Sequence, residues 1–224
     1  PKEQRDKPRD TPWGTMPYIK YKHRIEFNKN QYAEIDETCR LHGIKWFASV
    51  WDMPSVQFMA NMGCKVVKVP SAKITELALL QFCSQWFDTF ILSTGMSTEE
   101  EVERAIEAGR PDYVLHTHSA YPAPLNELNL RYLDHLMLKY VPRYPNMRIG
   151  YSGHEYELTT TFAAVAMGAS MIERHITLDR HMWGSDQLSS VEPVGLFKLV
   201  SGIRSIERAL GIAEARTVRE SEQA

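Results

Sequence analysis

Two histidines lie just past short apolar runs in the stretch from Gly150 to Asp179. His154 follows the run RIGYS, and His175 closes the run MIERH, with a helix-like segment between them. Neighbouring parallel strands lie about 4.8 Å apart, so imidazoles at two such strand ends can reach one divalent ion and leave positions open for substrate. Each histidine taken singly also fits a hydrogen-bonded structural role, and the spacing alone leaves both interpretations open.

Other polar side chains stand at or near the ends of further apolar runs. Lys68 interrupts the run VVKV, where an ammonium group is costly unless it meets an anion. Hydroxyl groups that converge on such a lysine suit a phosphate or carboxylate ligand; the alternative is a lysine that extends past the strand end into solvent. The remaining polar groups at these ends are Ser71, Ser93, Ser119, Tyr121, Ser152 and Glu173.

These polar residues can form one site only if the fold brings the strand ends together. The sequence alternates short β-rich runs with longer helical patterns, which is typical of a parallel sheet. Strands are predicted at residues 46–49, 66–69, 89–92, 113–116, 148–152 and 171–175. Helices are predicted at residues 55–61, 76–86, 99–108, 129–140, 158–167 and 194–210. A further helix starts at NKNQ (28–31) and ends at Gly43, while STEE (97–100) predicts a capping box for a helix that stops at Gly109.

Six β-then-α units with a leading helix fall two units short of the eight-unit barrel, the commonest closed form of this pattern. We therefore expect one domain over residues 1–224, a (β/α)₈ TIM barrel that lacks its first two strands and first helix in this chain. A six-stranded open sheet fits the same pattern. In both folds ligands bind at the C-terminal ends of the strands, where the polar residues stand.

Composition excludes several classes of partner. Lys and Arg total 26 against 28 for Asp and Glu, with the signs interspersed, so neither nucleic acid nor an anionic membrane is an expected partner. No apolar run approaches the roughly 20 residues that span a bilayer. Cys39, Cys64 and Cys83 match neither a zinc ribbon nor a redox pair, and an odd number does not suit a secreted disulfide scaffold. We expect a soluble protein in a reducing, cytoplasmic setting.

Longer motifs run from about Arg24 to Gly211. They include LSTGMSTEEEVERAIEAG, HSAYPAPLNELNLR, IGYSGHE, IERHITLDR, WGSDQ and SVEPVGLFKLVSGIRSIERALG. In combination these motifs resemble the sialic acid synthase family, the phosphoenolpyruvate-dependent nonulosonate synthases. The resemblance implies a (β/α)₈ barrel that condenses phosphoenolpyruvate with the aldehyde of an N-acetylated amino sugar, such as N-acetylmannosamine. The products would be a nine-carbon 2-keto acid of the sialic acid type and phosphate. Because members of that family commonly pair, the resemblance also allows a homodimer.

The resemblance assigns expected roles to individual residues. His154 and His175 fall on the family's metal-ligating histidines, with Mn²⁺ as the expected ion and Mg²⁺ or Co²⁺ as alternatives; the metal would polarise the aldehyde as a Lewis acid. The expected catalytic residues are Lys68, Glu173 and Tyr121. The expected substrate-binding residues are Ser71, Ser93, Ser119, Ser152 and Asp186, the last of them in WGSDQ.

The sequence also departs from the family pattern. Lys73 in KVPSAK stands where much of the family has a glutamate, so the role of that glutamate is absent or supplied elsewhere. The family's first-strand glutamate, second-strand lysine and C-terminal antifreeze-like domain have no counterpart in these 224 residues. Trp183, beside Gly184 and Asp186, is a candidate contact of the substrate loop.

The sequence also fits two other functions in part. His116 and His118 form an H-x-H on a predicted strand. Together with His154, His175 and an aspartate they match the inventory of a metal-dependent amidohydrolase. The order argues against that class, in which the H-x-H belongs on the first barrel strand and the lysine follows it. The second alternative is a barrel of the same family that binds sugar or phosphate without catalysis.

Overall fold

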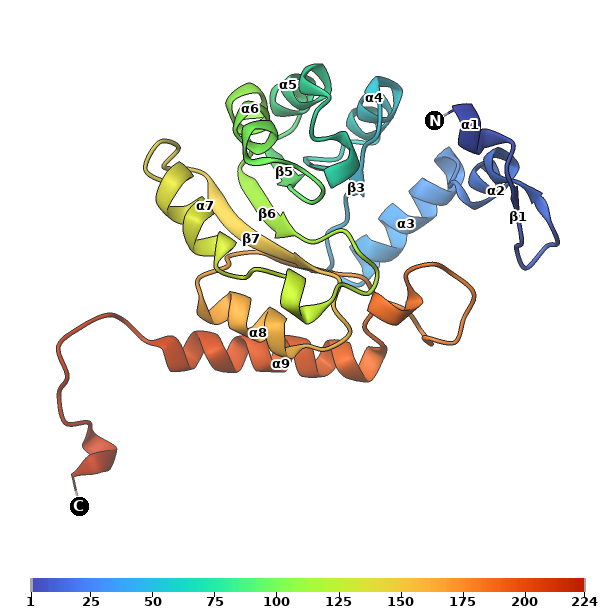
Figure 1. Cartoon of the computed structure of the whole chain (residues 1–224). Coiled ribbons are helices and arrows are strands. Elements are labelled where there is room, and N and C mark those ends of the chain that lie inside the picture. The colour runs from blue at the N-terminus through green and yellow to red at the C-terminus, as the bar shows by residue number, and fades with distance from the viewer. Residues whose placement is uncertain (1, 224) are drawn as a thin grey trace.

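A computed structural model describes residues 2–223 of the chain (Figure 1), and its centre is a curled parallel sheet. The strands are β3 (Ala48–Ser49), β4 (Val66–Val69), β5 (Thr89–Ser93), β6 (Tyr113–Thr117), β7 (Arg148–Gly153) and β8 (Ile172–Arg174). They pair in chain order. In the part of the chain that the structure describes, the sheet has six strands and is open, with β3 and β8 at its edges. The predicted alternation of parallel strands and helices is confirmed.

Helices connect the strands and cover the convex face of the sheet (Figure 1). They are α3 (Lys29–Leu41), α4 (Met53–Asn61), α5 (Leu77–Trp86), α6 (Glu99–Gly109), α7 (Tyr132–Tyr140), α8 (Thr159–Ala166) and α9 (Pro193–Leu210), with 3₁₀ turns η1 (Ser71–Lys73), η2 (Leu125–Glu127) and η3 (Gln187–Ser189). Strand residues such as Phe90 and Val114 pack against Ile106 of α6 and Leu136 of α7 in one buried cluster. Burying a side chain of this size contributes about 1.5–3 kcal/mol, so this layer between sheet and helices is the main source of stability.

The register of the strands divides their side chains between two faces. Alternate residues point to opposite sides of a strand, and the residues of the helix-facing cluster include Val67, Val69, Leu92 and Ile149. The other face therefore carries the residues between them. Ser93 pairs with Leu115, Thr117 with Ser152, and Ser152 with Glu173, which places this second set in one band on the concave face.

Some predicted boundaries are wrong by one to three residues. The capping box of α6 is formed by Thr98 and Glu101, one residue later than expected, and Arg110 rather than Gly109 takes the left-handed conformation that ends the helix. Helix α7 starts at Tyr132 because Asn129 has a φ of 44° and cannot extend it backwards. By contrast, the capping box that starts α3 at Asn28 is confirmed.

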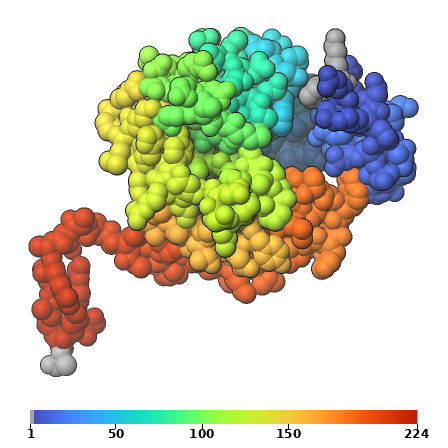
Figure 2. All heavy atoms as spheres, viewed as in Figure 1, coloured from blue at the N-terminus to red at the C-terminus, as the bar shows by residue number. Residues whose placement is uncertain are grey.

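The segment before α3 was not predicted in detail. It contains α1 (Lys2–Arg5), a short antiparallel pair of β1 (Pro8–Arg9) and β2 (Met16–Pro17), and α2 (Tyr18–Ile25). It lies beside the loop that follows β8 (Figure 2), and the ring of Tyr21 packs edge-on against Trp183 of that loop at 5.4 Å. The guanidinium of Arg9 lies 5.0 Å from the Tyr21 ring.

After α9 the chain extends away from the body and ends with a turn, η4 (Glu220–Glu222). Among residues 2–223, no helix has the length and apolar character needed to cross a membrane.

Candidate active site

Lys68 meets its anion inside the curled sheet. Its ammonium nitrogen lies 2.9 Å from Oε1 of Glu173, which comes from β8, four strands further along the sheet. The same carboxylate oxygen accepts a hydrogen bond of 2.8 Å from the Ser152 hydroxyl. The Lys68 side chain is only 12% exposed, so it is held inside and does not extend into solvent. The three predicted site residues therefore form one polar cluster across the concave face.

A second cluster joins the ends of β4, β5 and β6. The Ser71 hydroxyl accepts a hydrogen bond of 2.9 Å from the backbone N–H of Gly95. A Cβ atom at Gly95 would collide with the Ser119 hydroxyl and come within 3.0 Å of the Ser71 hydroxyl. The two predicted serines thus meet at a glycine that leaves room for nothing larger than hydrogen.

Ser93 ends β5 in a buried position with an unpartnered hydroxyl. The residue is 1% exposed, and its Oγ has no hydrogen-bond partner among the described residues. A buried hydroxyl without a partner loses the hydrogen bonds it would make with water. It lies on the concave side of the sheet, on the same face as Ser152 and Glu173.

His154 and His175 lie together, as predicted from their positions at consecutive strand ends. Their ring centroids are 5.2 Å apart and the rings are nearly perpendicular. Nδ1 of His154 lies 2.6 Å from the backbone oxygen of His118. Because a carbonyl oxygen can only accept, Nδ1 must donate, which leaves the lone pair of a neutral imidazole on Nε2. Burial lowers the pKa of His154, although the His118 carbonyl opposes the shift. The neutral form is the one that binds metals.

These features fit a metal site with few protein ligands. A backbone carbonyl that fixes the tautomer of a histidine is the usual partner of a ligating imidazole. Nδ1 of His175 lies 3.5 Å from Oδ2 of Asp186, which brings the predicted acidic residue to the second ring. No group of three or more His, Cys, Asp or Glu side chains within residues 2–223 is arranged to hold a metal ion. Two imidazoles would therefore leave most coordination positions to other oxygen ligands.

Tyr121 covers the histidine pair. Its ring centroid lies 4.1 Å from that of His154 and 5.5 Å from that of His175. Burial raises the pKa of Tyr121, and the carboxylates of Asp186 and Glu173 add to the effect. The phenol is therefore a hydrogen-bond donor at neutral pH, next to both histidine rings.

The side chains of the H-x-H pair do not join the histidine pair: Nε2 of His118 lies 3.2 Å from Glu127, and only the His118 backbone oxygen contacts His154. Nε2 of His116 donates to the carbonyl of Leu128 at 2.7 Å, and the ring packs edge-on against Tyr132 of α7. His116 therefore faces the helices, on the side of the sheet opposite His154 and His175. This geometry contradicts the amidohydrolase alternative, which needs both histidines of the motif at the metal.

Lys73, the departure from the family pattern, and Trp183, the candidate contact of the substrate loop, both lie outside the two clusters. Lys73 is in η1, and its ammonium lies 3.6 Å from Glu76, with the side chain 29% exposed. Trp183 is 43% exposed and contacts Tyr21. Neither is brought into the clusters around Lys68 or the histidine pair.

Two charged residues directly behind the histidines were not predicted from the sequence. Glu155 and Arg174 form an ion pair of 2.7 Å whose side chains are 0% and 2% exposed. Each is adjacent in sequence to one of the histidines. The signal that could have found them is the alternation in GHE and ERH, which sends every second residue to the opposite face.

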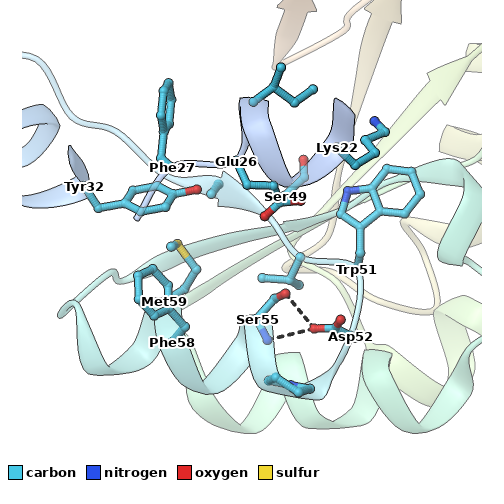
Figure 3. Close-up of a pocket in the computed structure, with 14 residues that line it drawn as sticks. Lys22, Glu26, Phe27, Tyr32, Ser49, Trp51, Asp52, Ser55, Phe58 and Met59 are labelled. Carbon is cyan, nitrogen blue, oxygen red and sulfur yellow. Dashed lines mark hydrogen bonds between the residues drawn. The ribbon is translucent and has the colours of Figure 1, made fainter. Parts of the chain in front are cut away.

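A separate cleft of about 650 Å³ lies between α2 and the β3–α4 turn (Figure 3) and holds none of the predicted site residues. Lys22 and Trp51 line it, and the Asp52 carboxylate is occupied in capping α4 through Ser55. It borders the free edge of β3 and belongs to the open side of the sheet.

Comparison with known proteins identifies the family. The sequence pattern of the NeuB family matches residues 1–215. The chain belongs to the NeuB family. This finding confirms the resemblance to sialic acid synthases on which the site assignments were based.

Individual relatives agree with this assignment. The chain is 35% identical over 203 residues to human N-acetylneuraminate-9-phosphate synthase, covering 89% of this chain and 55% of that protein. It is 32% identical over 201 residues to N,N'-diacetyllegionaminic acid synthase of Legionella pneumophila, covering 86% and 55%. The chain thus spans about half the length of the curated relatives it matches.

A solved structure shows the same fold. The N-acetylneuraminic acid synthetase of Leptospira borgpetersenii, in complex with citrate, superposes with a TM-score of 0.81 at 32% identity. The match covers 88% of this chain and 69% of that chain. The curled parallel sheet is therefore the family's architecture over the part that the two share.

Proposed function

We propose that the protein condenses phosphoenolpyruvate with the open-chain aldehyde of an N-acetylated amino sugar, giving a nine-carbon 2-keto sugar acid and phosphate. The observation that supports this most is the juxtaposition of two polar clusters at the strand ends. The cluster around Lys68 carries the positive charge that would bind an anion, and the other cluster brings together the imidazoles of His154 and His175. Membership of the NeuB family gives this arrangement its chemical meaning.

The anion-binding side would take phosphoenolpyruvate. Lys68 offers a positive charge, and Ser71, Ser93 and Ser152 offer hydroxyls on the same concave band. Glu173 neutralises Lys68 in the free protein and holds Ser152, so both donors are already oriented before a ligand arrives. Preoriented donors cost little reorganisation when charge develops in a transition state.

The aldehyde side would lie at the histidine pair. His154 and His175 would hold a divalent ion, with Mn²⁺ first and Mg²⁺ or Co²⁺ as alternatives, and the ion would supply Lewis-acid polarisation of the aldehyde oxygen. Tyr121, lying over both rings, would orient the sugar and donate a proton to a developing oxyanion. Asp186, beside His175, would bind sugar hydroxyls. Glu173 is the carboxylate within the Lys68 cluster that could move a proton at the reacting carbons.

A complete barrel would enclose this chemistry. The free edges of β3 and β8 could each accept one further strand, and two strands would close six into eight. We propose that such a closure forms in the active protein and that it covers the concave face now open between these edges. An active site closed in this way excludes water from the condensation.

The sugar that serves as acceptor is proposed only by class. Human and Legionella pneumophila relatives are named for different nine-carbon products, one of them phosphorylated. The acceptor classes to test are therefore an N-acetylhexosamine, its phosphate ester and a diacetamido sugar.

The test is metal-dependent phosphate release by the protein as encoded. Phosphoenolpyruvate and each acceptor would be supplied with Mn²⁺, and release would be compared between wild type, the double variant His154→Ala/His175→Ala and the control His42→Ala. His42 is the C-cap of α3, and its Nδ1 bonds to the Thr38 carbonyl. Release that requires acceptor and metal, and that is lost in the double variant alone, supports the proposal. A folded protein that releases no phosphate with any acceptor would refute catalysis and favour a barrel that only binds.

A further inference from the structure

The ion pair between Glu155 and Arg174 lies directly behind the two histidines. Glu155 follows His154 in the chain, and Arg174 precedes His175. Residues alternate between faces of a strand, so when the imidazoles project to the concave side, their charged neighbours project to the helix side. Gly153 and Arg174 are the last backbone pair between β7 and β8. The histidines lie just beyond that pair, where the ladder between the two strands has ended.

Arg174 ties down the chain on both sides of the histidine pair. Its guanidinium donates to the Glu155 carbonyl at 2.6 Å and to the Glu157 carbonyl at 3.0 Å, both in the turn after His154. It also reaches the Ser189 carbonyl at 3.4 Å, close to the segment that carries Asp186. One side chain thus holds the backbone after β7 and the backbone that returns after β8.

Glu155 is equally well held. Its carboxylate accepts hydrogen bonds from the Tyr151 hydroxyl at 2.9 Å and the Thr161 hydroxyl at 2.8 Å, besides the ion pair with Arg174. A Cβ atom at Gly153 would lie only 2.7 Å from Oε2 of Glu155. A larger residue at position 153 would therefore collide with the Glu155 carboxylate. The carboxylate and guanidinium are therefore fixed against β7, α8 and β8 together.

Stability alone is a weak explanation for this arrangement. Removing two charges from water is expensive, and well-packed apolar residues of similar volume often stabilise a fold as well or better. Nε of Arg174 is buried without a partner among the described residues, which adds to the cost. A buried pair that is costly and yet directly behind two candidate ligands points to a role in geometry.

We propose that Glu155 and Arg174 are positioning residues that set the separation and orientation of the His154 and His175 imidazoles. The backbone hydrogen bonds between β7 and β8 end just before the histidines. Beyond that point the Glu155–Arg174 ion pair connects the ends of the two strands. The identity of the ligand that the imidazoles bind rests on the proposed function. The positioning of the two rings does not, because it is a property of the metal-free protein. Partners of this kind behind a metal ligand commonly change affinity 10- to 100-fold when removed.

The test replaces the pair by apolar residues of similar size, in the double variant Glu155→Leu/Arg174→Met. The control is Glu103→Leu/Arg143→Met, which removes an ion pair of the same residue types, at 2.9 Å and partly exposed, between α6 and the turn that follows α7. Circular dichroism and thermal unfolding establish that each variant is folded. Nuclear Overhauser contacts between the His154 and His175 rings are then recorded in metal-free protein, and Mn²⁺ affinity is measured by the electron paramagnetic resonance of free Mn²⁺.

The expected result is loss of the inter-ring contacts and at least a tenfold fall in Mn²⁺ affinity in the folded buried-pair variant, with both unchanged in the control. If that variant does not fold, Glu155→Gln, which keeps the size and the Tyr151 and Thr161 partners, takes its place. Retained ring contacts and unchanged affinity in a folded variant would overturn the proposal and leave a purely structural pair. Wild-type protein without Mn²⁺ affinity would refute the metal site, while loss of the ring contacts in the variant would still support the positioning role.

Discussion

Lys68 shows how far a single residue can be interpreted from sequence. An ammonium in an apolar strand predicts a buried anion nearby, and the structure supplies Glu173 at 2.9 Å. The sequence could not say which carboxylate it would be, because the two residues are 105 positions apart and meet only when the sheet curls. The Ser71 and Ser119 hydroxyls meeting at Gly95 are a similar case: each residue was predicted, but the glycine between them was not.

Replacing Lys68 by Met tests the anion-binding role. The variant keeps the apolar stem and removes the charge that would meet phosphoenolpyruvate. Hydrogen bonds to charged groups contribute about 1.5–3 kcal/mol, so we expect the KM for phosphoenolpyruvate to rise roughly 10- to 100-fold. Lys65→Met is the matched control, since the Lys65 side chain is 76% exposed just before the same strand. An unchanged KM in Lys68→Met would remove Lys68 from the substrate site.

Substituting Gly95 by Ala tests the serine cluster. The added methyl group would collide with Ser119 and crowd Ser71, and overpacking of this kind costs about 1–3 kcal/mol. We expect a lower midpoint of thermal unfolding and a loss of phosphate release. Gly43→Ala, where the space is open but φ is +65°, gives for comparison the effect of backbone strain without a collision; Gly95 has no φ in that range, so its substitution tests the collision alone. Full activity in Gly95→Ala would show that the serines need no such close approach.

At the scale of elements, the alternation of strand and helix was predictable and the exact boundaries were not. Every strand from β4 to β8 overlaps its predicted range, because buried β-rich runs and helical periodicity are local signals. The box of Thr98 and Glu101 was missed by one residue, since Ser97 and Glu100 satisfy the same spacing. Which of two overlapping motifs caps a helix depends on the backbone of the preceding turn, and sequence does not show that turn.

Helices α6 and α7 are joined by the carboxylate of Glu99, which gives an acid-sensitive contact. Burial would raise the pKa of Glu99, but hydrogen bonds from Lys139, Tyr132, His135 and Tyr140 outweigh it and lower the pKa to about 2. A carboxyl whose folded pKa is depressed contributes stability above its unfolded pKa of 4.5, and that stability is lost as pH falls toward 2.

We therefore expect Glu99→Gln to lower the unfolding midpoint at pH 7 and to lose less stability than wild type between pH 5 and about pH 2. Thermal unfolding at a series of pH values measures this difference. Glu34→Gln, on an exposed position of α3, should follow the wild-type curve. Parallel curves for wild type and Glu99→Gln would contradict the assigned pKa.

On the scale of the whole molecule, the open sheet predicts an uneven distribution of local stability. Strands β5, β6 and β7 pair on both sides, whereas β3 and β8 are short and pair on one side only within the described residues. Amide hydrogen exchange should be slowest in β5 to β7 and fastest at β3 and β8. Pairing of two copies through an edge strand would slow exchange there more at high protein concentration. Measuring exchange at two protein concentrations therefore separates such pairing from the stability of the single chain. Strong protection of β3 at low concentration would show that its edge is already covered.

The fold class could be predicted as a whole, but closure of the barrel could not. Six repeated units indicate a parallel sheet, and the relation to the Leptospira borgpetersenii structure confirms its curl. The unpredicted packing of Tyr21 on Trp183 shows why the open side was hard to foresee: it is formed by a segment without repeated pattern. Closure and assembly, including any homodimer, remain predictions.

The proposed function requires a covalent bond between the two substrates, and mass spectrometry of the product detects that bond. The protein as encoded would be incubated with Mn²⁺, phosphoenolpyruvate labelled in its three carbons, and the acceptor that gives the fastest phosphate release. We expect a 2-keto acid that carries all three labelled carbons on the amino sugar, formed in equal amount with phosphate. Phosphate without the joined product, or labelled pyruvate in its place, would contradict it.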